Sequence, residues 1–505
     1  MQAQPASRLA SPGDPVPAGM RLAPDPATRL LGAAPATGRD PGPGQGRVLV
    51  GGSPVRVLRL TAAGARQVAG WLDGTPVPAA PAARALARRL LDAGLVHPDL
   101  GAAPDLPGVP GPGDVTVVIP VRDRHAELAR CLDGLRGAPH VLVVDDASAE
   151  PAAIKAIAAA RGADTISRPV NGGPGAARNS GLRAARTDLV AFLDSDCVPE
   201  PGWLTRLLPL FADPAVGAVA PRIVPYGDGT GWLARYEGAS STLDMGARPS
   251  VVRPGARVCY VPGAALVVRR LAAGEGFADG LYVGEDVDFV WRLAASGWRV
   301  RYEPAAVMGH DHRVTFRAWF SRRADYGTSA AVLEERHPGA VRPWYASWWT
   351  AGAWTAALSG CPVTAAALTA AATALLARRL APVTRRAAPP GKGTPRAAWG
   401  LALRLAGGGT LAAGRPLGSA LSRTWWPAAV PAAVAVRRLR LPLAALILAP
   451  PLLDWAARRP PLDPARYVAA RLLDDAAYSL GVWQGCLARR TIRPLLPVLG
   501  RKRPG

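Results

Sequence analysis

From residue 115 onward, short apolar runs alternate with segments in which apolar side chains recur every three or four residues. The apolar runs, which predict strands, cover residues 115–120, 140–146, 164–167 and 189–193. The periodic segments, which predict helices, cover residues 126–135, 151–160 and a stretch that opens at 171–181. Strands that alternate with helices at this spacing predict an α/β fold with a doubly wound, mostly parallel sheet. We expect its ligands at the carboxyl ends of the strands.

A different pattern precedes this domain. Residues 47–60 alternate apolar with polar or small residues around a Gly-Gly-Ser-Pro turn, which predicts a hairpin, and residues 62–72 and 82–93 predict two helices. We interpret residues 47–98 as a small winged-helix-like module, similar to the peptide-binding domains of enzymes that modify ribosomal peptides. A plain packing appendage is the alternative. Residues 1–46, dominated by Pro, Gly and Ala, predict a disordered N-terminus, and residues 99–114 a linker.

The second half of the domain, which we expect to span residues 115–335, has two informative stretches. Residues 258–269 predict a strand, a turn of small residues and a second strand. Residues 283–297 predict a helix that begins with Glu285, Asp286 and Asp288 and turns apolar side chains to the core, namely Val287, Val290, Trp291 and Ala294. Acidic residues in a first turn are ordinary capping chemistry, so position alone does not assign them a function.

The last third, residues 336–505, predicts a basic helical region. Residues 343–377 carry no charge and are long enough to cross a bilayer, whereas the apolar run 441–453 is short and interrupted by two prolines. From residue 341 the chain has 23 Lys and Arg against 4 Asp and Glu, so +19 of its net charge of +23 lies there. We expect these helices at the inner-leaflet membrane surface, with room for one span. Soluble helical packing is the alternative.

Composition narrows the partners and the compartment. A basic, Trp-rich tail suits an anionic membrane, while a nucleic acid would more typically meet a basic patch on a recognisable reading fold, so we expect no nucleic-acid partner. The five cysteines are scattered and form no Cys-x-x-Cys pair, which indicates a reducing cytosol rather than a disulfide framework. The N-terminus lacks a charged start followed by an apolar stretch. These features predict the cytoplasmic side of the cell membrane.

Four polar clusters fall at strand ends or helix starts. They are Arg122-Asp123, Asp145-Asp146 with Ser148, Arg178-Asn179, and Asp194-Ser195-Asp196. Asp145 or Asp146 can accept hydrogen bonds from a base imide or ribose hydroxyls, and Arg178 can meet a phosphate. Asp194 and Asp196 can hold a divalent cation that bridges two phosphates. An Asp-x-Asp pair alone is common in turns, so the prediction depends on all four clusters together.

The segments 118–123, 143–148, 173–179 and 192–196 together resemble family 2 glycosyltransferases, which have the GT-A fold. The resemblance covers about residues 114–335 and implies Asp286 as general base, with Glu285 as the alternative. It implies Mn2+ or Mg2+ bound by Asp194, Asp196 and His312. It further implies a UDP-sugar site formed by Pro120, Arg122, Asp123, Asp145, Asp146, Arg178, Asp194, Ser195, Asp196, Arg322 and Arg323. The Gln-x-x-Arg-Trp segment of processive members is absent, which argues against long-chain polymer synthesis.

The wider arrangement resembles a narrower group, the glycosyltransferases of the mycofactocin pathway in actinobacteria. The resemblance rests on the hairpin at 48–54, the Gly-Glu-Asp-Val-Asp segment at 284–288, residues 322–330 and the basic tail, and covers about residues 47–490. It implies transfer of a hexose, glucose from UDP-glucose, to a redox cofactor precursor made from a ribosomal peptide, with extension to a short β-linked oligosaccharide. The alternatives are a lipid-linked or cell-envelope glycan as acceptor, or an inactive peptide-binding protein.

Overall fold

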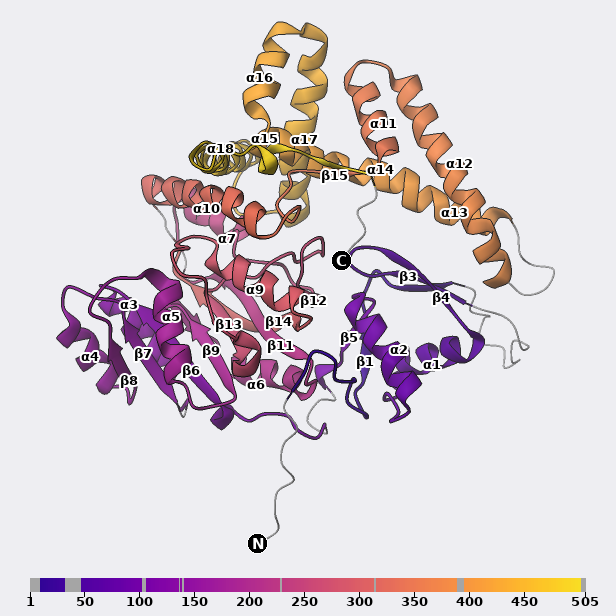
Figure 1. Ribbon diagram of the computed structural model, residues 1–505. Helices are drawn as coiled ribbons and strands as arrows, with labels where there is room; N and C mark the ends of the chain where they lie inside the picture. The colour runs from indigo at the N-terminus through magenta and orange to yellow at the C-terminus, as the bar shows by residue number, and fades with distance from the viewer. Residues whose placement is uncertain are drawn as a thin grey trace. The chain divides into compact units, whose positions relative to one another are not determined.

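The computed structural model describes residues 10–31, 47–101, 106–135, 137–138, 140–227, 229–312, 315–387 and 395–500 (Figure 1). The chain forms two compact units, each described by itself. The first comprises Met1–Leu30, Leu49–Gly227 and Ser241–His312. The second comprises Leu31–Val48, Asp228–Ser240 and Arg313–Gly505.

The first unit is built on a nine-stranded mixed sheet. One half is parallel, in the order β8 (Asp164–Ser167), β7 (Val141–Asp145), β6 (Val115–Val121) and β9 (Leu189–Leu193). The sheet continues through β13 (Ala265–Arg269), β11 (Val216–Pro225), β14 (Arg299–His310) and β10 (Cys197–Pro199), and β12 (Ser250–Val251) pairs with β14. Here β13 and β10 are antiparallel to their neighbours, while β11 and β14 are parallel. The predicted α/β fold with a mostly parallel sheet is confirmed.

Helices cover both faces of this sheet, because its central strands are apolar on both sides. On one face the odd-numbered residues of β6 join a core with α3 (His125–Gly134), α4 (Pro151–Ala159) and α6 (Trp203–Leu207). On the other face lie α5 (Gly173–Ala184) and α9 (Glu285–Ala295). A Cβ at position 181 of α5 would lie 2.2 Å from the Val118 side chain. The close approach of this helix to the sheet therefore requires glycine at this position. Phe277 stacks on Phe289 of α9 and meets Phe192 of β9 edge-on.

Two expectations for the second half need correction. Residues 258–269 contribute only β13, and Val258 forms an isolated bridge with Val252. Strand β14 runs from Arg299 to His310. In α9, Val287 and Ala294 are only half-buried, whereas Phe289 and Leu293 join Val290 and Trp291 in the core.

The N-terminal module contains the predicted hairpin, β3 (Arg47–Gly51) and β4 (Arg56–Leu60), and the helices α1 (Ala62–Leu72) and α2 (Pro81–Asp92). The expected disorder of the N-terminus is wrong for residues 10–31. They form β1 (Leu22–Pro24), which pairs with β5 (Val96–Pro98), and β2 (Arg29–Leu31), which pairs with β3. Val16, Met20 and Leu22 are buried in the same core as Trp71, so a few well-spaced apolar residues suffice despite the many prolines. Residues 1–9 and 32–46 lie outside the described residues.

The second unit is helical. Its elements are α7 (Trp232–Ser240), α10 (Phe316–Arg336), α11 (Trp348–Leu358), α12 (Pro362–Ala387), α13 (Pro395–Ala402), α14 (Gly408–Ala412), α15 (Gly414–Arg423), α16 (Trp426–Ala435), α17 (Arg440–Arg458) and α18 (Pro464–Ala488). The uncharged stretch 343–377 is not one helix, because Gly360, with φ 79°, and Pro362 separate α11 from α12. The run 441–453, by contrast, lies inside the continuous helix α17 despite Pro450 and Pro451. By length and composition, two segments could cross a membrane, Pro362–Pro382 and Arg437–Arg458.

Helices α10 and α18 pack closely enough that their contact depends on glycine. A Cβ on Gly481 would lie 1.8 Å from the carbonyl oxygen of Ala324, and one on Gly327 would lie 2.1 Å from that of Tyr478. We therefore expect Gly481→Ala to force the helices apart and to lower the free energy of unfolding by about 3 kcal/mol, measured by urea denaturation. Gly238→Ala is the matched control, because Gly238 is an exposed helical glycine with nothing within 4 Å of its Cβ position. Equal stabilities of the two variants would contradict this account.

Candidate active site

The loops after β6 and β7 are tied together at the carboxyl edge of the sheet. Asp123 and Ala147 both have left-handed backbones, with φ of 55° and 59°. Such conformations cost about 1–3 kcal/mol each in non-glycine residues and persist only where the surroundings enforce them. The Asp123 N–H donates to Ser148 Oγ at 3.0 Å, and the Ala149 N–H donates to Asp123 Oδ1 at 2.7 Å. These bonds fix the shape of the edge.

The two carboxylates at the end of β7 have different surroundings. Asp145 is fully buried, and its Oδ1 accepts from the Ser148 N–H at 3.0 Å, while its Oδ2 has no hydrogen-bond partner among the described residues. Asp146 accepts from the N–H groups of Gly172 and Gly173 at 3.0 and 2.8 Å and pairs with Arg168. Asp146 thus holds the glycine turn that opens α5. Asp145 Oδ2 is therefore a buried hydrogen-bond acceptor to which none of the described residues donates.

The structure brings most of the predicted residues to this one edge. Strands β6, β7 and β9 are parallel neighbours, so the residues that follow them share the edge. Pro120 lies buried within β6, and Ser195 is buried between Asp194 and Asp196. Arg122 and Asp123 form a half-exposed pair, with 3.6 Å between Arg122 Nε and Asp123 Oδ2. Their roles in binding a nucleotide sugar stay predictions.

A buried arginine links β9 to α9. Arg178 Nη2 lies 2.6 Å from Asp194 Oδ1, and its Nη1 lies 2.9 Å from Glu285 Oε1. Its guanidinium also lies over the Phe277 ring, 5.3 Å from the centroid. Burial alone would lower the pKa of Arg178, but Asp194 and Glu285 raise it, so the side chain stays charged. Asp194 is therefore held by Arg178 in this structure.

The two adjacent acidic residues of α9, Glu285 and Asp286, also have different surroundings. Glu285 is buried against Arg178, and burial, followed by the charge of Asp286, raises the pKa of Glu285 to about 7. Asp286 is half-buried and accepts from the Gly263 N–H at 2.7 Å and from the Val287 N–H at 2.8 Å. A Cβ on Gly263 would lie 2.9 Å from that of Asp286, so this contact needs glycine. Asp286 is the better placed of the two to take a proton from a ligand.

Asp196 and His310 form the candidate metal site. Asp196 Oδ1 lies 3.5 Å from His310 Nε2, and this buried oxygen accepts no hydrogen bond from the described residues. His310 and Arg124 lower the pKa of Asp196 although burial acts in the opposite direction. An ionised carboxylate and an imidazole fit a divalent cation. Cys197 lies in the same group, but burial raises its thiol pKa well above the usual value, and Sγ donates to the Ala264 carbonyl.

Three predicted ligands have other contacts. The His312 ring lies 5.5 Å from that of His310, and it is His310 that meets Asp196. In the helical unit, Arg322 lies over the Tyr326 ring at 5.0 Å. Arg323 is buried between Glu237 and Asp474, at 2.5 and 2.9 Å, which neutralise its charge. These contacts favour a structural role for Arg323.

Sequence reasoning missed His310 as the partner of Asp196, and Arg124, whose guanidinium pairs with Asp196. The antiparallel pairing of β10 with β14 places Cys197 opposite His310, and this register fixes the choice between the two histidines. The sequence motif does not distinguish His310 from His312, because both belong to the same His-Asp-His segment.

The raised pKa of Glu285 predicts a pH dependence of stability. The folded state keeps Glu285 protonated up to about pH 7, whereas the unfolded chain ionises near 4.5. Its stabilising contribution is thus complete below about pH 4.5 and is lost as the pH rises through 7. We expect the wild type to lose about 1–3 kcal/mol more unfolding free energy than Glu285→Gln between pH 4.5 and 7.5, measured in urea. Parallel curves for the two proteins would contradict the assignment.

The chain is similar to known glycosyltransferases. The model of a family described as glycosyl transferase family 2 matches residues 116–273. Pre-mycofactocin glycosyltransferases of two strains of Mycobacterium tuberculosis are 40% identical over 464 residues, which cover 90% of this chain and 95% of theirs. An O-antigen chain rhamnosyltransferase of Salmonella typhimurium is 27% identical over 161 residues, which cover 30% of this chain and 51% of that one. The mycobacterial match extends far beyond the residues that the family model covers.

Solved structures are similar at a lower level. A mannosyltransferase from Pyrobaculum calidifontis, in complex with GDP-mannose and Mn2+, gives a TM-score of 0.35 with 23% identity and covers 61% of this chain and 92% of that one. Glucosyl-3-phosphoglycerate synthase from Mycobacterium tuberculosis, with Mn2+, UDP-glucose and phosphoglyceric acid, gives 0.32 with 22% identity and covers 44% and 79%.

Proposed function

We propose that this chain, which belongs to glycosyltransferase family 2, transfers a hexose from a nucleoside diphosphate sugar to an acceptor hydroxyl with inversion of configuration. The observation that supports this most is the grouping at one sheet edge. It combines a buried free acceptor at Asp145, the Asp194–Arg178–Glu285 network and the Asp196–His310 pair. These groups supply the hydrogen-bond acceptor, the fixed carboxylates and the candidate metal ligands that donor binding and departure of the nucleoside diphosphate require.

The donor would bind across the ends of β6, β7 and β9. The free Oδ2 of Asp145 would accept from the base or ribose, and the turn held by Asp146 would bring backbone close to the nucleotide. Arg122 is exposed enough to reach a phosphate. Arg178 would act differently from our first expectation, by orienting Asp194 and Glu285 rather than by contacting phosphate freely.

Asp196 and His310 would hold a divalent cation, Mn2+ or Mg2+. Such a cation would neutralise negative charge on the departing diphosphate. Arg124, which pairs with Asp196 in this structure, supplies a second positive charge at the same place. His312 remains a candidate additional ligand, since its ring is close to that of His310.

Asp286 would be the general base. An inverting transfer needs a carboxylate on the face opposite the leaving group to take the acceptor proton. The two N–H groups that Asp286 accepts from fix its side chain. Glu285, tied to Arg178, would set the position of its neighbour.

For the acceptor we propose premycofactocin, the ribosomal-peptide-derived cofactor precursor, and for the donor UDP-glucose. The 40% identity with the mycobacterial pre-mycofactocin glycosyltransferase over 90% of the chain supports the acceptor. Extension to a short β-linked oligosaccharide and recognition of the peptide part by residues 47–98 belong to the same proposal. Residues 115–335 would form the catalytic domain.

We further propose that residues 336–505 contact the inner leaflet, which would place the enzyme on the cytoplasmic face of the cell membrane. The net charge of +19 from residue 341 onward and the two long apolar helices support this. Anionic lipids attract such a segment by about 1 kcal/mol per basic residue near the surface.

The test is nucleotide release by the purified full chain with Mn2+ and a panel of nucleotide sugars. UDP release from UDP-glucose that rises with premycofactocin would support the proposal. Release that requires extracted membrane lipid instead would indicate a lipid-linked or envelope glycan. No release with any donor would favour an inactive peptide-binding protein.

A further inference from the structure

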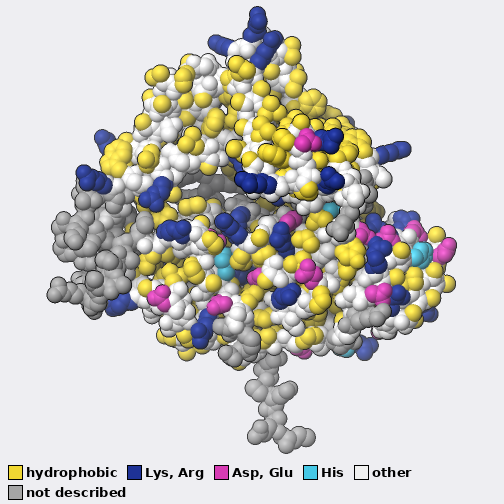
Figure 2. Space-filling view, turned by 180° about the vertical axis from the view of Figure 1, so that it is seen from behind, with side chains coloured by type: hydrophobic (Ala, Val, Ile, Leu, Met, Phe, Trp, Pro, Cys, Tyr) yellow, Lys and Arg dark blue, Asp and Glu magenta, His cyan; other side chains and the backbone are white. Residues whose placement is uncertain are grey.

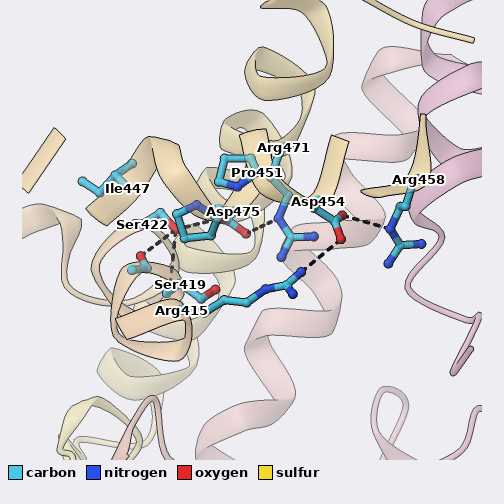
Figure 3. Close-up of a pocket in the computed structure, with 11 residues that line it drawn as sticks. Arg415, Ser419, Ser422, Ile447, Pro451, Asp454, Arg458, Arg471 and Asp475 are labelled. Atoms are coloured by element: carbon cyan, nitrogen blue, oxygen red, sulfur yellow. Dashed lines mark hydrogen bonds and ion pairs between the residues drawn. The ribbon is translucent and has the colours of Figure 1, made fainter. Parts of the chain in front are cut away.

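A polar pocket of about 180 Å³ lies within the helical unit, between α15, α17 and α18 (Figure 3). Its charged lining comprises Arg415, Arg458 and Arg471 with Asp454 and Asp475, and Ser419 and Ser422 add hydroxyl groups. Pockets for whole small-molecule ligands usually measure about 300–1,000 Å³. This one suits a single charged group rather than a nucleotide sugar.

The charges of the lining do not balance. Asp454 forms ion pairs with both Arg415 and Arg458, each at 3.0 Å, and Asp475 lies 3.5 Å from Arg471. Three guanidinium groups therefore face two carboxylates, and Arg423, also 3.5 Å from Asp475, adds a fourth. Figure 3 shows the guanidinium groups of Arg415 and Arg471 directed toward the same space. Like charges brought together in this way leave a site for an anion.

The surroundings of the pocket are apolar and exposed. On α17, Leu448, Leu452 and Leu453 are 38%, 43% and 65% exposed, and they alternate with the lining residues Ile447, Pro451 and Asp454. Figure 2 shows hydrophobic side chains over much of the visible face of the helical unit, with basic side chains gathered at a tip. Exposed Arg437 and Arg438 lie between α16 and α17, and exposed Arg440 is the first residue of α17.

We propose that this pocket binds the phosphate of an anionic phospholipid headgroup. The arginines and the Ser419 hydroxyl would hold the phosphate oxygens, and the leucines of α17 would meet the start of the acyl chains. The Ser422 hydroxyl donates to Asp475 instead. A free phosphate would satisfy the same arginines but would leave those leucines in water. The inference deepens the membrane contact proposed above and does not depend on the transfer chemistry.

The experiment is flotation of the full chain with vesicles of phosphatidylglycerol and phosphatidylcholine, compared with vesicles of phosphatidylcholine alone. The test variant is Arg415→Gln, because the Arg415 side chain is 63% exposed and its loss should be tolerated in folding. Arg466→Gln is the matched control, since this arginine of α18 is 73% exposed and absent from the pocket lining. Arg471→Gln is the stronger second variant, accepted only if its melting temperature stays near that of the wild type.

We expect the wild type to bind the anionic vesicles and Arg415→Gln to bind them more than about tenfold less well. Arg466→Gln should lose no more than about fivefold, the effect of one surface charge. Equal losses in the two variants would overturn the pocket while leaving the membrane contact intact, and no vesicle binding by the wild type would overturn both. Binding of free glycerol 3-phosphate as tight as that of the anionic vesicles, compared per accessible phosphate, would overturn the lipid as the source of the phosphate. UDP release on a soluble acceptor, measured in parallel, keeps these outcomes separate from failure of the proposed transfer.

Discussion

Asp286→Asn is expected to lower turnover about 10²–10⁴-fold while leaving nucleotide binding within about twofold of the wild type. Asn has nearly the shape of Asp but cannot take the acceptor proton. The two N–H donors of Gly263 and Val287 also predict a loss of stability, because the amide group offers an oxygen to only one of them. That loss should be about 1–3 kcal/mol in unfolding free energy. Turnover, UDP affinity and melting temperature should all be measured.

Asp164→Asn is the control for loss of a carboxylate charge. Asp164 is exposed at the amino end of β8, on the edge opposite the site, and should leave turnover unchanged. Full activity of Asp286→Asn would remove the base assignment and direct attention to Glu285. A variant that loses UDP affinity as severely as turnover would indicate that Asp286 acts on the donor instead.

Asp196→Asn is expected to weaken Mn2+ binding by more than the 10–100-fold typical of lost outer-shell partners, since it removes a proposed direct ligand. Binding should be followed by titration calorimetry or by the electron paramagnetic resonance of free Mn2+, independently of turnover. Turnover should fall in parallel, and chelation of the wild type should abolish transfer until Mn2+ or Mg2+ is restored.

Arg124→Gln provides the contrast. It leaves Asp196 and His310 in place and removes the cation that pairs with Asp196, so Mn2+ should bind at least as tightly as in the wild type. Unchanged Mn2+ affinity in Asp196→Asn would contradict the site. Weaker Mn2+ affinity in Arg124→Gln would mean that Arg124 orients the carboxylate rather than competing with the ion.

The parallel half of the sheet was readable from sequence because its patterns are local. The strands at 164–167 and 189–193 have the predicted limits, and the polar clusters after β6, β7 and β9 share one edge as expected. The same reasoning failed at residues 258–264, where Val258 forms only an isolated bridge, and at residues 10–31, where isolated apolar residues are buried by distant elements. The average composition of a segment does not reveal single apolar residues that are buried by distant parts of the chain.

The site was predictable as a set of carboxylates but not in its pairing. Which of Asp194 and Asp196 meets Arg178, and which histidine meets Asp196, depends on the register of β10 against β14 and on the packing of α5 against α9. Neither this strand register nor this helix packing produces a periodic pattern in the sequence. The burial of Arg323 likewise follows from distant partners, Glu237 and Asp474, whereas Arg322 lies over Tyr326 in the same helix.

The strands of residues 10–31 bear on how the protein can be shortened for expression or crystallisation. The composition of residues 1–46 invites a start at residue 47. Such a trimmed protein would lose β1 and β2, so that β5 and β3 would each lose a pairing partner. It would also lose Val16, Met20 and Leu22 from the core around Trp71. A trimmed protein that keeps residue 10 onward retains every one of these contacts, so the useful cut lies before residue 10.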